Sequence, residues 1–179
     1  MKFAGLPTLS HPLVVLRPLT AADIQTWYDY LSLPEVYGET SWNLQSSTEL
    51  EPYVWREEAF TPSSMLRFAI ALRSSNQLVG TAGFHTVVPV HRTAEIAYDL
   101  SPLVWGKGIA TAACQVLVNW AHASANVNRV QATILESNER SIRVIERAGF
   151  NREGLLHAYR MLRDRPGNFH MYAHVQTAA

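Results

Sequence analysis

The chain has 179 residues and a mass of 20.1 kDa, the size of one ordinary globular domain. Fifteen basic residues balance fifteen acidic ones, so no net positive charge favours nucleic acid or an anionic membrane as a partner. Hydrophobic residues make up 47 % of the chain, which excludes a disordered tail. Cys114 is the only cysteine, which excludes an internal disulfide and a cysteine-based zinc site.

Pro7 and Pro12 interrupt the short apolar stretches near the N-terminus, a pattern unlike that of a secretory signal. No apolar run approaches the roughly 20 residues that span a bilayer. We therefore expect a cytoplasmic protein in which residues 1–179 form one domain. A monomer and a homodimer both fit the sequence.

The first elements are predicted from a strand pattern and a capping signal. Residues 14–17 are predicted to form a strand. Thr20 and Asp23 have the spacing of a capping box and begin an amphipathic helix that reaches about Ser32. Pro34 ends this helix because proline cannot continue the hydrogen-bond ladder.

A second helix is predicted over residues 48–60, with Pro52 in its first turn. Segments rich in strand-forming residues then predict antiparallel strands, at residues 65–72, 78–87 and 94–100. The last of these alternates apolar residues with Glu95, Ala97 and Asp99, which predicts a strand buried on one face.

The apolar period becomes helical from Gly108 to about Ala125. Another strand, a short helix closed by Gly149 and two more strands follow, at residues 129–136, 141–148, 155–162 and 169–176. This order predicts an α+β fold, with a mostly antiparallel sheet and one parallel pair across the long helix.

The segment LSPLVWGKGIAT, residues 100–111, places two glycines where a strand ends and a long helix begins. Glycine allows the backbone to approach a ligand closely, and the free N–H groups of the first helical turn suit phosphate oxygens. Lys107 adds a positive charge. A turn that only caps the helix remains the alternative. The spacing differs from that of a P-loop, and Thr111 replaces the third glycine of a dinucleotide-binding loop.

A second segment, ESNERSIRVIERAGF at residues 136–150, follows the strand after the long helix. Asn138 and Ser141 lie three residues apart at the predicted start of the short helix. This spacing is typical of an N-cap, in which the Asn138 side chain accepts a hydrogen bond from the Ser141 N–H.

Together the two segments resemble the GNAT acetyltransferase superfamily, and most closely its ribosomal-protein N-terminal acetyltransferase branch, the RimJ/RimL type. LRPLTAADI and LSLPEVY near the start of the chain support the resemblance. It implies a GNAT fold and acetyl-CoA as co-substrate, with no metal. The coenzyme-binding residues that it implies are Asp99, Leu100, Trp105, Gly106, Lys107, Gly108, Ile109, Ala110, Thr111, Asn138 and Ser141.

The resemblance also implies two catalytic residues. Glu95 matches a strand glutamate that serves as the base in several members. Ile145 stands where many members have a tyrosine that protonates the departing thiolate, and Ser141 is the candidate that replaces it. The alternative for Glu95 is an exposed carboxylate paired with Arg92 or another cation. The alternative bases are His85, His91 and His157.

The acceptor is expected to be an amine. An α-amino group is roughly 15 % neutral at pH 7, whereas a lysine amine is only about 0.04 % neutral, so an α-amine needs the weaker base. The RimJ/RimL resemblance implies a protein N-terminus as the acceptor, and such an α-amine needs only a modest base. A small amine (a polyamine, amino acid or antibiotic) is the alternative, and a non-catalytic acyl-CoA-binding module is the other. The acceptor cleft implied by the family contains Tyr37, Glu39, Trp42, Asn43, Tyr159 and Arg160.

Overall fold

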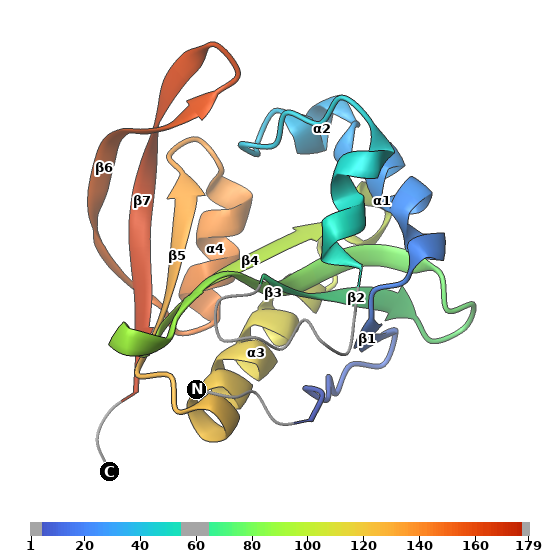
Figure 1. Ribbon diagram of the computed structural model, residues 1–179, viewed down its shortest axis with the longest axis horizontal. Helices are drawn as coiled ribbons and strands as arrows, with labels where there is room; N and C mark the ends of the chain where they lie inside the picture. The colour runs from blue at the N-terminus through green and yellow to red at the C-terminus, as the bar shows by residue number, and fades with distance from the viewer. Residues whose placement is uncertain (1–4, 55–64, 177–179) are drawn as a thin grey trace.

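The computed structural model describes residues 5–54 and 65–176, which form a seven-stranded sheet with helices on both faces (Figure 1). The strands are β1 Val14–Pro18, β2 Leu66–Leu72, β3 Leu78–Val88, β4 Thr93–Leu100, β5 Arg129–Leu135, β6 Asn151–Leu162 and β7 Arg165–Val175. Their order in the sheet is β1-β2-β3-β4-β5-β7-β6. The β4–β5 pair is parallel and every other neighbouring pair is antiparallel, which confirms the predicted α+β class.

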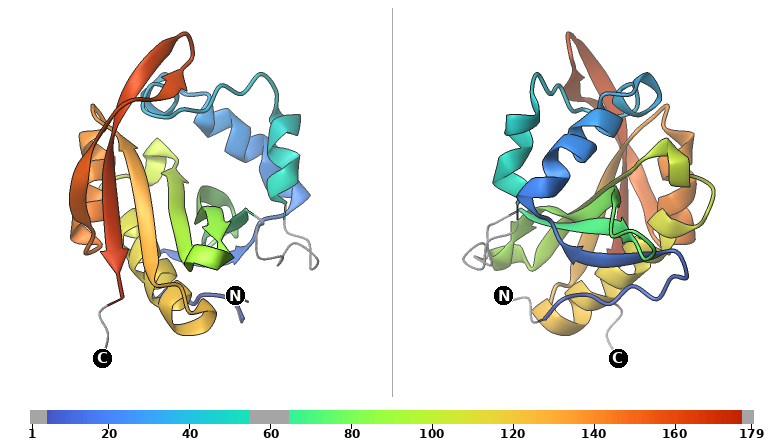
Figure 2. Two further views of the ribbon diagram at one scale, coloured as in Figure 1. Left: turned by 60° about the vertical axis from the view of Figure 1, so that its left-hand side comes forward. Right: turned by 90° about the vertical axis from the view of Figure 1, so that its right-hand side faces the viewer.

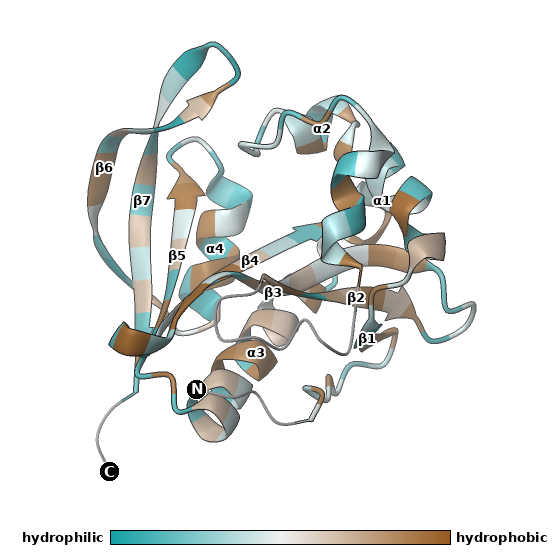
Figure 3. Cartoon of the chain, in the orientation of Figure 1, coloured by the Kyte–Doolittle hydropathy of each residue, from teal (hydrophilic) through white to brown (hydrophobic). Residues whose placement is uncertain are grey.

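The helices divide the core into two parts, on opposite faces of the sheet (Figure 2). The α-helices are α1 Ile24–Leu31, α2 Pro34–Tyr37, α3 Ile109–Ala125 and α4 Glu139–Arg147. Phe68 and Ile70 of β2 point toward the core that contains α3, whereas Ala69 between them packs in the core that contains α1. The apolar colouring of β2, β3 and α3 in Figure 3 follows from this burial, because β2 and β3 lie between two layers.

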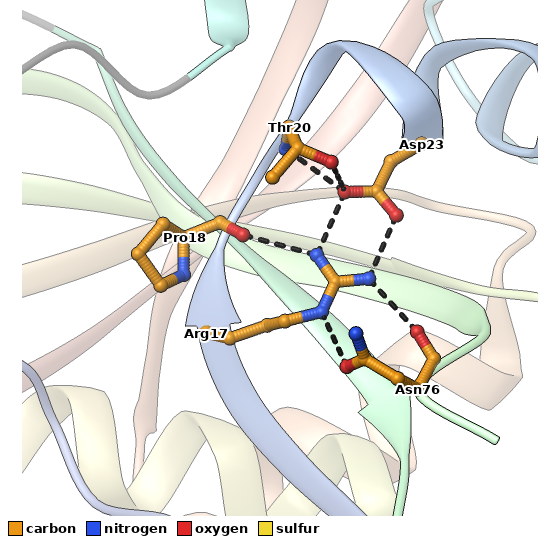
Figure 4. Close-up of polar contacts among 5 residues, drawn as sticks. All are labelled: Arg17, Pro18, Thr20, Asp23 and Asn76. Atoms are coloured by element: carbon orange, nitrogen blue, oxygen red, sulfur yellow. Dashed lines mark hydrogen bonds and ion pairs between the residues drawn. The ribbon is translucent and has the colours of Figure 1, made fainter.

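Arg17 holds the first strand, the start of α1 and the β2–β3 turn together (Figure 4). Its guanidinium donates two 2.7 Å hydrogen bonds to Asp23 and a 2.9 Å bond to the Asn76 side chain. The Thr20 N–H donates to Asp23 at 2.8 Å, which confirms the predicted capping box. Burial opposes ionisation of Asp23, but the hydrogen bonds from Arg17 and Thr20 outweigh it and lower the pKa of this carboxyl.

The second predicted helix differs from the structure. A 3₁₀-helix, Ser47–Tyr53, begins one residue before the predicted start, and residues 55–60 of the prediction lie outside the described residues. Pro52 lies inside this helix, not in its first turn, and proline supplies no N–H for an α-helical ladder. The short helix α2 was not predicted; it begins at Pro34, because proline suits the first helical position.

Strand β4 is covered on both faces, so the prediction of a strand buried on one face was wrong. Ala94 and Ile96 pack in the core with α3, as the alternation predicted. Glu95 and Asp99 on the other face are also buried, with only 9 % and 7 % of their surfaces exposed. The elements packed over this face bury the carboxylates, and the sequence pattern does not reveal such long-range cover.

The parallel pairing between β4 and β5 is short. It joins Thr93–Glu95 with Arg129–Gln131, and the two strands separate beyond it (Figure 2). In the described part of the chain, the edge of β4 that faces β5 therefore has no strand partner after Glu95. This separation opens the sheet beside the start of α3 and the start of α4.

Candidate active site

The opening between β4 and β5 forms part of a cavity of about 920 Å³. Its wall includes α2 and the loop after it, β4, β5, the loop before α3 with the first turn of α3, and α4 along its length. All the predicted coenzyme-binding and catalytic residues line this one cavity: Glu95, Asp99, Leu100, Trp105, Gly106, Lys107, Gly108, Ile109, Ala110, Thr111, Asn138 and Ser141. The fold thus brings together two motifs that are separated in the sequence.

The glycine loop fits a bound diphosphate. Gly106 and Gly108 have φ angles of +75° and +74°, a region that side chains rarely adopt. A Cβ at either position would meet no atom within 4 Å, so both glycines face open space. Gly108 caps the 17-residue helix α3, whose first N–H groups carry the positive end of the helix dipole. The Trp105 indole fixes the loop by donating a 2.9 Å hydrogen bond to the Leu100 carbonyl.

Asn138 caps α4 as predicted, and it also joins the two sides of the cavity. Its Oδ1 accepts a 3.0 Å hydrogen bond from the Ser141 N–H, and its Nδ2 donates a 3.1 Å bond to the Glu39 carbonyl. Arg140 forms a second bridge. Its guanidinium lies 4.1 Å from the centroid of the Trp105 ring and donates to the Glu35 carbonyl at 3.3 Å.

Helix α4 presents Ser141 and Val144 to the cavity, but not Ile145. Ile145 is fully buried in the core with α3 and does not line the cavity. The Ser141 backbone carbonyl accepts a 3.1 Å hydrogen bond from the hydroxyl of Tyr98 on β4. Tyr98 was not among the predicted site residues; it fixes the segment that carries the Ser141 hydroxyl.

Glu95 is a buried member of an ion pair. Its Oε1 accepts hydrogen bonds from Arg160 Nη2 at 2.8 Å and from the Thr133 hydroxyl at 2.7 Å. The alternative interpretation, an exposed carboxylate paired with Arg92 or another cation, was wrong about the exposure, whereas its pairing with another cation is confirmed by Arg160. Arg92 instead donates to the carbonyl of Asn126 at 2.7 Å. Among the described residues, Glu95 Oε2 has no hydrogen-bond partner.

Of the three alternative histidines, His85 lines the cavity, whereas His91 and His157 lie outside its wall; all three side chains are exposed. The register between β3 and β4 shifts at His85, and such a bulge redirects a side chain. Loss of surrounding water lowers the pKa of His85; the charge of Glu95 opposes this, while those of Arg160 and Arg67 reinforce it. The lowered pKa keeps this imidazole neutral at pH 7, so it can accept a proton.

The carboxylate of Asp99 binds several buried side chains, which the sequence did not predict. Its carboxylate accepts hydrogen bonds from Tyr30, Thr81 and Trp27 at 2.5, 2.7 and 3.1 Å, and pairs with Arg67 at 3.4 Å. Burial and the charge of Asp99 raise the pKa of Tyr30 well above its ordinary value, so its hydroxyl remains a donor. An arginine inside the apolar strand LRFAIAL was the available signal for this buried cluster.

Four of the six predicted acceptor residues line the cavity: Glu39, Trp42, Asn43 and Arg160. The other two lie outside the cavity wall, which corrects the prediction. Tyr37 packs beneath the guanidinium of Arg163, 4.2 Å from its ring centroid. Tyr159 packs against Phe169, with the ring centroids 6.0 Å apart. Both contacts depend on the β6–β7 hairpin.

Within residues 5–54 and 65–176, no group of three or more His, Cys, Asp or Glu side chains is placed to hold a metal ion. The same part of the chain contains no helix with the length and apolar character needed to cross a membrane. Cys114 is buried in α3, and burial raises the pKa of its thiol, so it is packed as predicted and stays protonated.

The chain is similar in sequence to known acetyltransferases. The family described as "Acetyltransferase (GNAT) domain" matches residues 14–151. The uncharacterized N-acetyltransferase YoaA of Bacillus subtilis is 28 % identical, over 95 % of this chain and 97 % of its own. The ribosomal-protein-serine acetyltransferase of Escherichia coli is 31 % identical over 56 % of each chain. The spermidine N(1)-acetyltransferase of the same species is 32 % identical, over 39 % of this chain and 38 % of its own.

Solved structures show the same architecture. A GNAT-family acetyltransferase from Bacillus anthracis superposes with a TM-score of 0.78 at 22 % identity, covering 94 % of this chain and 98 % of its own. RimJ of Mycobacterium smegmatis, crystallised with CoA-disulfide, superposes with a TM-score of 0.75 at 25 % identity, covering 94 % of this chain and 88 % of its own.

Proposed function

Because the chain belongs to the GNAT acetyltransferase family, we propose that this N-acetyltransferase moves the acetyl group of acetyl-CoA to the α-amino group of a protein N-terminus. In this proposal it acts as a RimJ/RimL-type enzyme, with residues 1–179 as one domain. The similarity to the ribosomal-protein-serine acetyltransferase and the fold shared with RimJ support this assignment.

The coenzyme is proposed to lie along β4 and across the start of α3. The N–H groups from Gly108 to Thr111 would hold the diphosphate, with Lys107 adding charge, and the backbone at Asp99 and Leu100 would hold the pantetheine arm. When bound, acetyl-CoA supplies a thioester whose carbonyl carbon is attacked. The β4 edge beyond Glu95 has no strand partner, so a backbone N–H there can polarise the thioester carbonyl.

The reaction then needs one proton acceptor and one donor. Glu95, His85 or a water removes the proton from the acceptor ammonium, and the neutral nitrogen forms a bond to the acetyl carbon. The carbon–sulfur bond breaks and its electron pair leaves on the coenzyme thiolate, while the second proton of the attacking nitrogen passes to that thiolate, directly or through water, so that an amide and the coenzyme A thiol are formed. Ser141 donates a hydrogen bond to that thiolate from the cavity wall. No covalent enzyme intermediate is needed.

The observation that carries the choice of acceptor is the Glu95–Arg160 ion pair. One oxygen of Glu95 is already bound by Arg160 and Thr133, which leaves Oε2 to receive a proton or orient a water. This arrangement suits an amine that is partly neutral at pH 7. An α-amine near pKa 7.8 meets that condition, whereas deprotonating a side-chain amine near 10.4 costs about 3.5 kcal/mol more than deprotonating the α-amine.

A polyamine is the second candidate, and the acidic wall of the cavity favours it. Glu35, Glu39 and Glu49 all line the cavity, and Glu39 Oε2 is buried with no hydrogen-bond partner within residues 5–54 and 65–176. Carboxylates in that position suit the second ammonium of a polyamine. The similarity to a spermidine N(1)-acetyltransferase supports the same candidate.

An acceptor panel tests the proposal. Purified protein and acetyl-CoA are incubated with peptides that have free or blocked N-termini and internal lysines, and with spermidine and single amino acids. Coenzyme A release gives the rate, and mass spectrometry locates the acetyl group. We expect acetylation of free α-amines. Modification confined to spermidine would establish the second candidate, and coenzyme binding without release on any acceptor would indicate a non-catalytic module.

A further inference from the structure

Arg67 is a buried cation on the wall of the cavity. It lies in β2 between Leu66 and Phe68, which pack in the core with α3, so its side chain is on the opposite face of the sheet. Only 6 % of its surface is exposed, yet it lines the cavity. Burying a guanidinium is costly unless its charge and its N–H groups find partners.

The partners within the protein leave Arg67 incompletely bound. Its Nη2 lies 3.4 Å from Asp99 Oδ2. The Asp99 carboxylate also accepts three shorter hydrogen bonds, from Tyr30, Thr81 and Trp27. The Nε and Nη1 atoms of Arg67 are buried and have no acceptor among the described residues. The guanidinium lies 5.8 Å from the centroid of the Trp27 ring, a contact that satisfies no N–H group.

Arg67 lies on the part of the cavity wall proposed for the acceptor, and not on the loop proposed for the coenzyme diphosphate. Arg67, His85, Glu95 and Arg160 all line the same cavity, and strand pairing places Arg67 opposite Gly83, two residues before His85, and Glu95 opposite Thr86, one residue after it. The residues that suit the diphosphate belong instead to the loop before α3. A free donor of Arg67 thus lies near the groups that would remove the amine proton.

We propose that Arg67 recognises an oxygen of the acceptor, borne by the carbon next to the one that carries the amine. This oxygen is a carbonyl in a peptide N-terminus or an amide, and a carboxylate in a free amino acid. A carbonyl oxygen can accept a hydrogen bond from the Nε or the Nη1 of Arg67, and a carboxylate can engage one of these together with the second N–H of Nη2. A polyamine has no such oxygen. The inference rests on the proposed function and deepens it, because it names the oxygen by which the enzyme recognises its acceptor.

Three matched acceptors test the proposal: alaninamide, alanine and ethylamine, which carry a carbonyl, a carboxylate and neither. The kcat/KM for each is measured for the wild type, Arg67→Met and Arg67→Lys. Arg152→Met is the control, because Arg152 is exposed and lies outside the cavity wall. Comparing variants on one acceptor removes the intrinsic differences in amine pKa.

We expect Arg67→Met to lower kcat/KM on an oxygen-bearing acceptor by about 10- to 100-fold, mainly through KM, because a hydrogen bond to a charged donor is lost. The rate on ethylamine should change by less than about twofold, since no such bond forms there. Arg67→Lys should retain part of the preference. A fall in kcat/KM confined to alaninamide would show that Arg67 recognises a carbonyl. A fall confined to alanine would show that it recognises a carboxylate.

An equal loss on all three acceptors, or no loss on any, would overturn the role of Arg67. Thermal unfolding and acetyl-CoA affinity show whether Arg67→Met is folded; if it is not, Arg67→Lys carries the comparison. Acetylation of spermidine by a wild type that ignores both oxygen-bearing acceptors would overturn the Arg67 proposal and the α-amine assignment, while acetyl transfer itself stands. A wild type inactive on every amine overturns the proposed function, and the Arg67 proposal with it.

Discussion

Arg160 on β6 and Glu95 on β4 are 65 residues apart in sequence and 2.8 Å apart in the cavity. Strand β6 lies at the edge of the sheet, beyond β5 and β7, and β4 separates from β5 after Glu95. The Arg160 side chain contacts Glu95 at this separation. The ion pair therefore spans the opening that the coenzyme and the acceptor would share. Glu95 is held in place by this contact, and its second oxygen is left for chemistry.

Glu95→Gln keeps the shape of the side chain and removes its ability to accept a proton. We expect kcat/KM on a high-pKa amine to fall by about 10²- to 10⁴-fold, and on an α-amine by less, because more of the α-amine is already neutral. Coenzyme A release on both acceptors is the measurement. Glu153→Gln is the control, since Glu153 pairs with Arg129 outside the cavity wall. Equal rates for Glu95→Gln and the wild type on both amines would reject Glu95 as the base.

Ser141→Ala removes the hydroxyl proposed to assist the departing thiolate. The Ser141 N–H bond to Asn138 and the carbonyl bond from Tyr98 both involve the backbone, so the alanine variant retains them. We expect kcat to fall by about 10- to 100-fold, with little change in acetyl-CoA affinity. Ser137→Ala, an exposed position outside the cavity wall, provides the comparison. A matching fall in affinity would mean that Ser141 binds the coenzyme rather than serving the leaving group.

Gly108→Ala places a methyl group in the space proposed for the diphosphate. The protein has room for this Cβ, so within the chain the cost is the φ of +74°, about 1–2 kcal/mol. We expect acetyl-CoA affinity, measured by calorimetry, to fall by about tenfold or more. Gly5→Ala is a matched control, with φ of +66° and equally open space away from the cavity wall. If both variants kept wild-type affinity, the loop would be only a helix cap.

Asp23→Asn tests the ion pair that anchors α1, whose Trp27 and Tyr30 hold Asp99. We expect the free energy of unfolding at pH 7 to fall by about 1–3 kcal/mol, because two charge-assisted hydrogen bonds from Arg17 are weakened. The pKa of Asp23 is lowered in the folded protein, so its contribution is complete above the unfolded value of about 3.9 and disappears as the pH falls below it.

Urea unfolding at pH 7 and near pH 3 measures this effect. The difference between the wild type and Asp23→Asn should be large at pH 7 and smaller at the acid end. Asp164→Asn, at an exposed turn position, should change stability at neither pH. A difference between the wild type and Asp23→Asn that stays constant with pH would show that the ionisation of Asp23 does not contribute.

The sequence by itself determined the order of the strands and of the helices α1, α3 and α4, the start of α3, the capping box before α1 and the cap of α4. These features depend on residues within a few positions of one another: the period of apolar side chains, the spacing of Thr20 and Asp23, and the glycines before α3. The family resemblance was also carried by two continuous segments. Such local patterns can be recognised in the sequence because they do not depend on contacts with distant parts of the chain.

The tertiary structure alone decided the partner of Glu95, the buried cluster around Asp99 and Arg67, and which of the three histidines lines the cavity. Each depends on strand order and register, since a bulge of one residue redirects His85 and a distant hairpin supplies Arg160. The balanced charge of the whole chain gave no hint of this arrangement, because the charges that matter are the few that folding removes from water.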